Sequence, residues 1–171
     1  MDIIKYHKNS IPITERISIL QLLNTVFNES ETVIQDNNEE ICRIAIFDLD
    51  KCIAHGVGYI RQMNIDKYRF PAGIIGGIAV DDNYRKQGIA KQILSIIHEE
   101  FNTNKIKHSF LFANNPNVYL SSGYSLLPNK LHIFDSITQE WHIWNWPNSM
   151  YRNFTHIDLP NGIVEFNGQN Y

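Results

Sequence analysis

The segment Ile74–Leu94 (IIGGIAVDDNYRKQGIAKQIL) constrains the fold more than any other part of this chain. An apolar run that ends at Val80 meets a short polar turn, and isoleucines then recur at the three- and four-residue spacing of a helix. A buried strand that leads through a tight turn into an amphipathic helix is the first half of a β-α-β unit, whose strands run parallel. The next apolar run, Ser109–Ala113, supplies the second strand.

Hairpins are expected around this unit, which comprises strand Gly73–Val80, helix Tyr84–Phe101 and strand Ser109–Ala113. Asn64–Ala72 is expected to be a polar loop. The pattern predicts further strands at Ile41–Asp48, Cys52–Met63, Tyr124–Leu127, Leu131–Phe134, Glu140–Trp146 and Ile157–Phe166, and further helices at Thr14–Phe27, capped by Thr14, and at Asn117–Ser122, ended by Gly123. This order predicts a mixed sheet that is mostly antiparallel.

Composition bounds the class of protein. The chain has 171 residues, of which 43% are hydrophobic and 19% are charged, and this suits a single domain over residues 1–171. The formal net charge of −3 argues against nucleic acid as a partner. We expect no membrane partner, since no apolar run approaches the roughly 20 residues of a membrane span. Cys42 and Cys52 lie at opposite ends of a predicted hairpin, so we expect no disulfide and a cytoplasmic location.

The start of the predicted helix has the properties of an anion site. A helix N-terminus leaves backbone N–H groups without partners and carries partial positive charge. Gly88 and Ala90 let a ligand approach the backbone, and Arg85 and Lys86 add positive charge. Gly76-Gly77 interrupts the preceding strand, which indicates a bulge or a close approach by another group. The pattern favours a diphosphate with an amide-containing arm that pairs with the strand end.

These residues resemble the signature of the GNAT superfamily of N-acetyltransferases, Arg/Gln-x-x-Gly-x-Gly/Ala, through Arg85, Gly88 and Ala90. The preceding strand residues, Ile78-Ala79-Val80, fit the same context. A second segment, Asn117–Tyr124, resembles the family's short helix that ends in an aromatic residue, three residues, Gly and an aromatic residue. The resemblance covers roughly Cys42 to Leu127. It implies a GNAT-like α+β fold, with a twisted sheet of six to seven strands, helices on both faces, and a parallel pair splayed to hold acetyl-CoA.

The resemblance also implies acetyl-CoA as co-substrate, bound by a core of about residues 73–127. Ile78, Ala79 and Val80 would offer backbone groups to the pantetheine arm. The Asn115-Pro116 pair lies closer to Tyr119 than is usual in the family, and Asn115 is carried over as a further cofactor contact. The diphosphate would be held by the segment that comprises Arg85, Lys86, Gln87, Gly88, Ile89, Ala90 and Lys91.

Tyr119 stands where many family members place a catalytic tyrosine beside the sulfur of the coenzyme. A phenol with a pKa near 10 can donate a proton to a leaving thiolate whose pKa is near 8.5. The alternative is that Tyr119 is a core aromatic residue. The general base is left open among several candidates, each of which also has a structural interpretation, and a chain of waters is a further option. The candidates are Asp48, Asp81, Asp82, His55, His132, Glu165 and the Tyr171 carboxylate.

Two functional classes follow. The first is transfer of an acetyl group to a primary amine of a small molecule by direct attack in a ternary complex, with a peptide or protein amine as a variant. The second is a non-catalytic acetyl-CoA sensor or scaffold. Dimers are common in the family, so a homodimer stays open. The seven histidines form no HExxH motif and no paired His/Cys spacing, so no metal is expected.

Two C-terminal features bear on the acceptor. Glu140–Trp146 (EWHIWNW) is either an aromatic wall for the acceptor or, as we favour, a strand with one face in the core and the other packed against a neighbouring subunit or the C-terminal tail. The tail LPNGIVEFNGQNY faintly resembles that of the aminoglycoside 2′-acetyltransferases. If the tail covers the acceptor site, Glu165 and the terminal carboxylate attract a polyamine-like cation.

Overall fold

The computed structural model describes residues 1–7, 10–29, 32–34, 37–135, 138–155 and 157–168. The chain forms two compact units, each made of two stretches of sequence. Unit 1 comprises Met1–Tyr59 and Ile75–Glu100, and unit 2 comprises Ile60–Ile74 and Phe101–Tyr171. The adjacent strands β3 (Lys51–Ile65) and β4 (Tyr68–Val80) run through both units, as does helix α2.

In unit 1, β1 (Asp2–Tyr6), β2 (Glu40–Asp48) and the first part of β3 form an antiparallel sheet. The sequence predicted β2 and β3 but not β1, because the apolar residues of β1 do not alternate; its partner strand β2 defines it. Cys42 and Cys52 are both buried and free.

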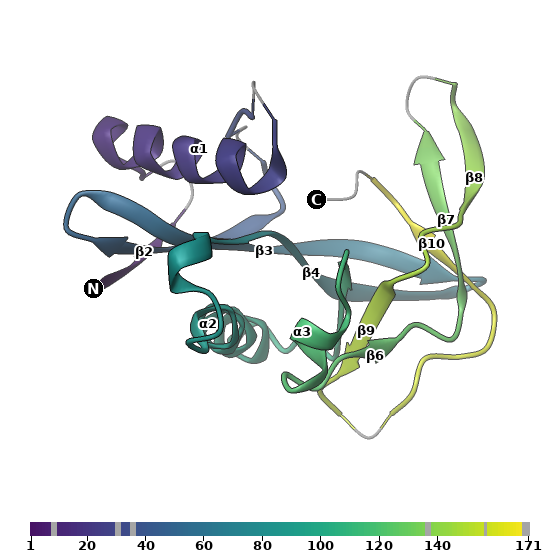
Figure 1. Cartoon of the computed structure of the whole chain (residues 1–171). Coiled ribbons are helices and arrows are strands. Elements are labelled where there is room, and N and C mark those ends of the chain that lie inside the picture. The colour runs from purple at the N-terminus through teal and green to yellow at the C-terminus, as the bar shows by residue number, and fades with distance from the viewer. Residues whose placement is uncertain (8–9, 30–31, 35–36, 136–137, 156, 169–171) are drawn as a thin grey trace. The chain divides into compact units, whose positions relative to one another are not determined.

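Helix α1 (Ile13–Phe27) covers one face of this sheet (Figure 1). Its inward residues pack with residues of β1, β2, β3 and the end of β4 in a core cluster. The expected cap at Thr14 is wrong, because the helix begins after Pro12 and has no side-chain cap. The cluster comprises Tyr6, Ile19, Leu22, Leu23, Ala45, Phe47, Cys52 and Ala79.

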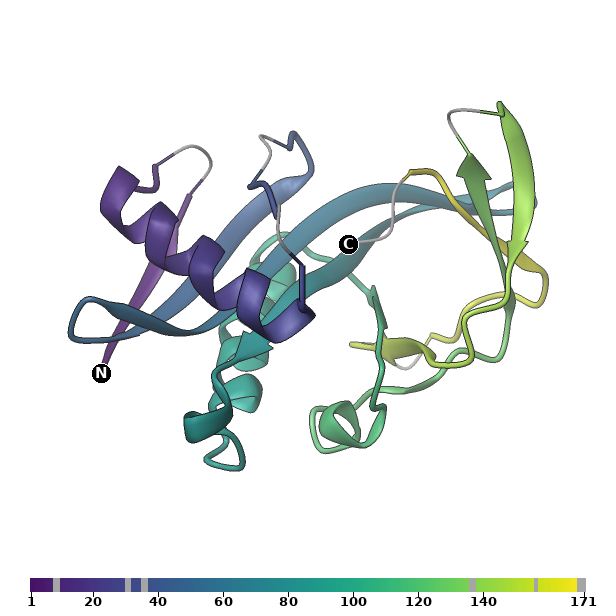
Figure 2. The ribbon, with the colours of Figure 1, turned by 45° about the horizontal axis from the view of Figure 1, so that its top comes forward.

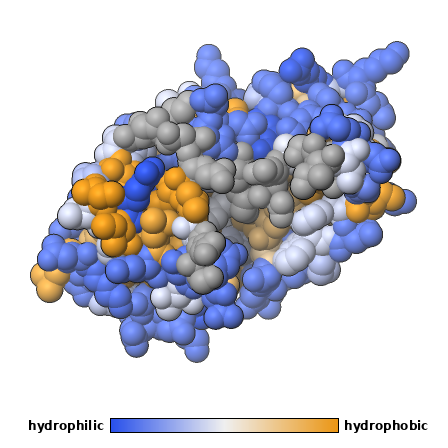
Figure 3. Space-filling model, turned by 90° about the horizontal axis from the view of Figure 1, so that it is seen from above, coloured by the Kyte–Doolittle hydropathy of each residue, from blue (hydrophilic) through white to orange (hydrophobic). Residues whose placement is uncertain are grey.

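The outer side of α1 is also apolar. Ile13 and Ile17, one helical turn apart, are 69% and 50% exposed, and Phe27 is 41% exposed. Figure 3 shows the resulting apolar surface over this helix. α1 therefore lacks the clear division between an apolar and a polar face that α2 has.

Helix α2 (Ile89–Thr103) lies on the opposite face of the unit 1 sheet from α1 (Figures 1 and 2). Its buried residues Ile93 and Ile97 reach Gly56 of β3, which leaves room for them. The sequence predicted one helix over Tyr84–Phe101. The structure instead has a 3₁₀ turn, η1 (Asp82–Tyr84), a loop, and then α2, because Lys86 (φ 63°) and Gly88 (φ 80°) adopt left-handed conformations that a helix excludes.

In unit 2, β4 pairs in parallel with β5 (His108–Phe112), with Gly73 opposite Ser109 and Ile74 opposite Phe110. β9 (Ser149–Asn153) follows antiparallel to β5, and the short β6 (Ser125–Leu126) pairs with β9. The predicted β-α-β unit is confirmed. β9 was not predicted.

A second group of strands in unit 2 joins the far end of β3. β7 (Lys130–Asp135) and β8 (Glu140–Trp144) form a hairpin, and β10 (Ile163–Phe166) lies between β7 and β3. β10 is parallel to β7, so unit 2 contains a second parallel pair that the sequence pattern did not predict. The helix α3 (Asn117–Leu120) is shorter than expected, and Gly123 after it has the left-handed φ of 82° that its position predicts.

The expected loop Asn64–Ala72 is wrong. The turn between β3 and β4 takes only two residues, with Asp66 in a left-handed conformation (φ 51°), and β4 begins at Tyr68. Tyr68 stacks on Phe70 with ring centroids 5.3 Å apart, and the following Pro71 is exposed. Aromatic packing therefore extends the strand through residues whose composition alone favoured a loop.

The expected fold class is confirmed as mixed α/β with a mostly antiparallel sheet. The described part of the chain has ten strands, where six to seven were expected. In unit 1 the helices α1 and α2 cover both faces of the sheet, as predicted.

Packing of α2 on its sheet depends on the missing side chain at Gly56. A Cβ added there would lie 2.5 Å from Ile78 Cδ1 and 2.6 Å from Ile93 Cγ2. We predict that Gly56→Ala lowers the free energy of unfolding by about 1–3 kcal/mol. In a double-mutant cycle measured by urea denaturation, Gly56→Ala with Ile93→Ala should cost less than the sum of the single changes. Full additivity would contradict this packing.

Candidate functional site

The loop before α2 is held in shape by its own side chains. The Asp81 carboxylate accepts a hydrogen bond from the backbone N–H of Asn83 (3.0 Å), which caps η1, and pairs with Lys51 Nζ at 2.6 Å. The hydrogen bond from Lys51 holds the pKa of Asp81 below its usual range. Arg85 Nη2 lies 2.8 Å from Asp82 Oδ1. Asp81 therefore caps η1, and Asp82 pairs with Arg85 within the turn.

Backbone N–H groups without a protein acceptor lie where this loop meets α2. The first helical hydrogen bond runs from Gln92 N–H to the Gly88 carbonyl (3.0 Å), so the N–H groups of Ile89, Ala90 and Lys91 have no helical acceptor. For Lys86, Gln87 and Gly88, no backbone N–H hydrogen bond is found within the described residues. Gly88 is exposed, and a Cβ built on it would meet nothing within 4 Å. The loop therefore presents open backbone amides, which fits a diphosphate.

The charged residues of this segment differ in whether their side chains can reach an anion. Lys86 and Lys91 are exposed. Besides its pairing with Asp82, Arg85 donates from Nε to the Val80 carbonyl at 3.2 Å. The Arg85 side chain is thus bound to the turn itself. Lys86 and Lys91 are exposed and can approach an anion. The Gln87 carboxamide lies 3.4 Å from the Asn83 carbonyl.

At the end of β4, side chains and backbone face different surroundings. Ala79 is buried in the core cluster under α1, and the Ile78 side chain lies over Gly56 on the opposite face. The N–H of Asp81 donates to the Ile53 carbonyl of β3 at 2.8 Å, which ties the strand end to its neighbour. A ligand at the end of β4 would therefore meet mainly the backbone groups of Ile78, Ala79 and Val80.

Next to these residues, β4 contains a left-handed residue, Gly77 (φ 60°). Its carbonyl accepts a hydrogen bond from Nδ1 of His55 at 2.8 Å, and Nε2 of His55 lies 2.8 Å from Nη1 of Arg43. Arg43 in turn pairs with Glu40 at 2.6 Å. His55 and Arg43 are almost fully buried. Burial, followed by the charge of Arg43, lowers the pKa of His55 to about 3.

The hydrogen bonds of His55 bear on whether it can be the general base. Both ring nitrogens of His55 are engaged and its pKa is far below the neutral range, so His55 is unsuited to accept a proton from an amine. Glu40 and Arg43 were not predicted as part of a site. Arg43 alternates with Ala45 and Phe47 along β2, so the three residues share one face of the strand, and the structure buries that face in the core cluster.

Tyr119 lies in unit 2, in the short helix α3. Its ring meets the Tyr124 ring edge-on with centroids 6.3 Å apart. Burial raises the pKa of Tyr119 to about 12, and no hydrogen bond of its hydroxyl is found among the described residues. The Tyr124 hydroxyl, by contrast, hydrogen-bonds the Ser109 hydroxyl in the core. Tyr119 therefore carries a protonated hydroxyl without a protein partner in that part of the chain.

Asn115 lies two residues before α3, and its side-chain oxygen accepts a hydrogen bond from the backbone N–H of Asn117 at 3.2 Å. The residue is exposed. This hydrogen bond holds the turn that leads into the helix carrying Tyr119.

The other base candidates are scattered. Asp48 in unit 1 accepts the Tyr84 hydroxyl at 2.6 Å. In unit 2, Glu165 accepts a hydrogen bond from the Asn64 side chain at 3.2 Å, and His132 is half-buried on β7. The Tyr171 carboxylate lies outside the described residues. Among the residues that the structure describes, neither unit gathers these carboxylates and histidines into one group.

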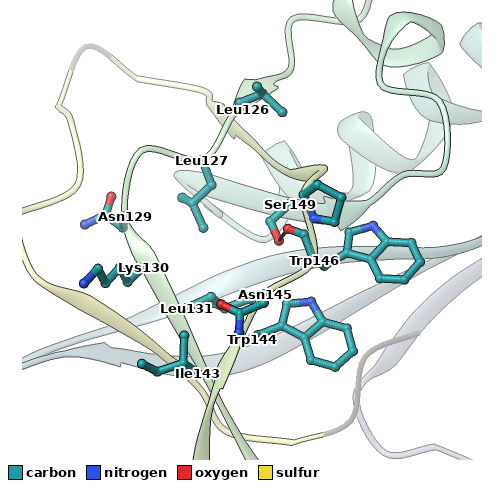
Figure 4. A pocket seen from close by; sticks show the side chains of 11 residues that line it. Leu126, Leu127, Asn129, Lys130, Leu131, Ile143, Trp144, Asn145, Trp146 and Ser149 are labelled. Carbon is teal, nitrogen blue, oxygen red and sulfur yellow. Dashed lines mark hydrogen bonds between the residues drawn. The ribbon is translucent and has the colours of Figure 1, made fainter.

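Unit 2 also contains a pocket of about 350 Å³ between the β6–β7 connection and the segment that follows β8 (Figure 4). Leu127 and Leu131 point into its middle, and the indole rings of Trp144 and Trp146 lie on the side away from Lys130. The two indoles stack with centroids 6.2 Å apart, and Trp144 also meets the Phe112 ring of β5 edge-on at 5.9 Å. Trp144 and Trp146 therefore pack on each other within unit 2, whereas the β8 residues before Trp144 are exposed on both faces.

Among the described residues, no three His, Cys, Asp or Glu side chains converge as metal ligands would. In the same residues, no helix has the length and hydrophobicity needed to cross a membrane.

Comparison with known families bears on this geometry. A family described as "Acetyltransferase (GNAT) domain" matches residues 10–127, which is more than half of the chain. Comparison with curated protein sequences finds no significant match.

Solved structures share the fold. The GNAT family N-acetyltransferase YhbS from Escherichia coli, in complex with CoA, is 17% identical with a TM-score of 0.69, over 97% of this chain and 89% of that one. A probable N-acyltransferase from Enterococcus faecalis is 19% identical with a TM-score of 0.59, over 72% of this chain. The present chain covers 32% of the length of that protein.

An aminoglycoside acetyltransferase, meta-AAC0020 from an uncultured soil metagenomic sample, in complex with trehalose, is 20% identical with a TM-score of 0.53, over 71% of this chain and 82% of that one. At these identities the likeness concerns the fold alone.

The buried His55 predicts how stability depends on pH. The unfolded chain protonates this histidine near its ordinary pKa of 6.5, whereas the folded protein resists protonation down to about 3. The stability that neutral His55 confers is therefore complete above pH 6.5 and is lost as pH falls toward 3. Between about pH 7 and 5.5, we predict that the wild type loses about 1.2 kcal/mol more unfolding free energy than His55→Asn.

Urea denaturation at the two pH values measures this difference. Burial also lowers the pKa of His108, but His108 is present in both proteins, so its contribution cancels. Parallel loss of stability in the two proteins would show that His55 is already accessible to protons in the folded state.

Proposed function

Since the chain belongs to the GNAT acetyltransferase family, we propose that it transfers the acetyl group of acetyl-CoA to a primary amine of a small molecule. The observation that carries this proposal is the row of backbone amides from Lys86 to Lys91 that have no protein acceptor. We further propose that the two units serve a single acetyltransferase domain, with the coenzyme-binding core in residues 73–127.

The fit to the coenzyme rests on the loop before α2. Amides without protein acceptors, the partial positive charge of the helix end and two exposed lysines favour a diphosphate over a neutral ligand. Open space above Gly88 permits close approach of the phosphate oxygens. A relative of the same fold, YhbS, was solved with CoA, which supports this choice of ligand.

The pantetheine arm has amide groups, which we propose to pair with the backbone of Ile78, Ala79 and Val80 as an added strand would. The side chain of Ala79 is committed to the core, so recognition at this position relies on backbone groups. The Val80 carbonyl already accepts a hydrogen bond from Arg85 at 3.2 Å and has a second lone pair available.

In the reaction, the amine nitrogen attacks the thioester carbon, the carbon–sulfur bond breaks, and negative charge develops on sulfur. With its pKa raised to about 12, the Tyr119 phenol stays protonated at neutral pH. Complete proton transfer to a thiolate with a pKa near 8.5 is uphill from such a phenol. We therefore propose that Tyr119 acts as a hydrogen-bond donor to the developing thiolate, which takes its proton finally from water.

The attacking amine must lose a proton. Since the carboxylates and histidines considered as bases are dispersed and mostly bonded elsewhere, we propose that this proton leaves through water. Two alternatives stay in view, an acceptor amine on a peptide or protein and a non-catalytic acetyl-CoA-binding module. Both keep the same diphosphate site.

Ala90→Glu tests the diphosphate site. The new carboxylate would occupy the anion position at the first turn of α2, and an acidic residue there stabilises a helix by about 0.3–1 kcal/mol. We predict unchanged or higher thermal stability and at least tenfold (about 1.4 kcal/mol) weaker CoA binding by calorimetry. Ser95→Glu, which adds the same charge at an exposed position further along α2, is the control and should bind CoA normally. Equal affinities in both variants would contradict the proposed site.

Tyr119→Phe tests the catalytic role. Release of free thiol from acetyl-CoA is measured across a panel of small primary amines and peptides, which also separates an enzyme from a sensor. We predict that kcat falls about 100-fold while the Kd for acetyl-CoA is unchanged, since one transition-state hydrogen bond is lost. Tyr124→Phe, which removes a buried structural hydroxyl, should lower stability but spare kcat. Normal turnover by Tyr119→Phe would remove this residue from the mechanism.

A further inference from the structure

Gly77 adopts a backbone conformation that is rare within a strand. Its φ of 60° lies in the left-handed region, and such a glycine marks a bulge in a strand. A Cβ at this position would lie 3.2 Å from Cε1 and 3.3 Å from Nδ1 of His55. The bare backbone of Gly77 and the His55 ring therefore occupy adjoining space, and a side chain at residue 77 would displace the ring.

The hydrogen bonds of His55 define its tautomer. Arg43 can only donate, so Nε2 of His55, 2.8 Å from Arg43 Nη1, is the acceptor. Nδ1 therefore carries the proton and donates it to the Gly77 carbonyl at 2.8 Å. The ring is a neutral connector between a cation on β2 and a carbonyl on β4.

Arg43 is itself fixed by two hydrogen bonds to Glu40. Nη2 reaches Oε2 at 2.6 Å and Nε reaches Oε1 at 3.2 Å. The side chains of this pair are only 5% and 9% exposed, so neither group is free to exchange its partner for water. A buried chain of hydrogen bonds thus runs from Glu40 through Arg43 and His55 to the backbone of β4.

Because the peptide bond is planar, the orientation of the Gly77 carbonyl also fixes the orientation of the Ile78 N–H. In a planar trans peptide, the carbonyl of Gly77 and the N–H of Ile78 point in opposite directions. A Gly77 carbonyl held toward the His55 ring therefore holds the Ile78 N–H away from it. Rotation of this peptide plane would turn the N–H toward the ring and would leave the buried Nδ1–H without an acceptor.

We propose that His55 is a positioning residue for the coenzyme: by holding the Gly77 carbonyl, it fixes the peptide plane that presents the Ile78 N–H to the pantetheine arm. This role rests on the proposed function, which assigns the end of β4 to that arm. Glu40 and Arg43 hold the ring in its place and in its tautomer. None of the three touches the coenzyme.

Two substitutions separate the two hydrogen bonds of His55. The side-chain amide nitrogen of Asn can replace Nδ1 as donor to Gly77, whereas the side-chain oxygen of Gln can replace Nε2 as acceptor from Arg43. With CoA as the probe in calorimetry, His55→Asn should bind within threefold of the wild type. His55→Gln should bind about tenfold more weakly, a loss of about 1.4 kcal/mol. The KM for acetyl-CoA should rise in His55→Gln with kcat within twofold.

Both variants lose one buried hydrogen bond, so a purely structural residue would lower their melting temperatures and their CoA affinities alike. Equal affinities in the two variants, with CoA bound by the wild type, would overturn the positioning role alone. No CoA uptake by the wild type would overturn the proposed function and this role with it.

A measurement on the wild type covers the case in which the variants do not fold. The ¹⁵N shifts of the His55 imidazole should show a protonated Nδ1 and an unprotonated Nε2, both without and with CoA. A proton on Nε2 would overturn the proposal, because the Gly77 carbonyl would then have no donor.

Discussion

The break between η1 and α2 is the constraint on which the rest of the candidate site depends. If residues 82–103 formed one continuous helix, the amides of Lys86 to Lys91 would donate hydrogen bonds to carbonyls of that helix and could not bind a ligand. The left-handed conformations of Lys86 and Gly88 prevent this and let α2 begin afresh at Ile89. The N-terminus so created is open because Gly88 has no side chain and Arg85 folds back on the turn.

Two groups of hydrogen bonds and ion pairs fix the backbone of unit 1 near the start of α2. On the surface, Lys51, Asp81 and Asn83 tie the turn to β3. In the interior, Glu40, Arg43 and His55 form a buried chain that ends on Gly77. Buried ionic groups of this kind contribute little net stability, since their desolvation cost offsets their attraction. Their use here is conformational, since they select one backbone orientation in β4 beside the segment that we propose to bind the coenzyme.

Sequence periodicity predicted much of the fold for clear reasons. The apolar run of β2 follows from burial of both of its faces, and the helical spacing of α2 follows from burial of one face, so both predictions hold in the structure. The αL end of α3 followed from Gly123. The interrupted start of α2 was not predicted, because positive φ at Lys86 has no compositional signal.

The extension of β4 from Gly73 back to Tyr68 was also missed, because cross-strand partners and ring packing, not local composition, make those residues a strand. For the site, motif spacing predicted where a diphosphate would bind and which tyrosine to examine. Motif spacing could not predict the hydrogen bonds from Arg43 through His55 to Gly77. These bonds depend on the register of β2 and β3, in which Ala45 lies opposite His55.

The most direct test of the account is an NMR titration of ¹⁵N-labelled protein with CoA, followed residue by residue. The account predicts the largest amide shifts at Lys86 to Lys91, downfield as expected for new hydrogen bonds to phosphate, with further changes at Ile78 and Val80. Shifts confined to the unit 2 pocket around Leu127 and Trp144, with the start of α2 unmoved, would contradict it.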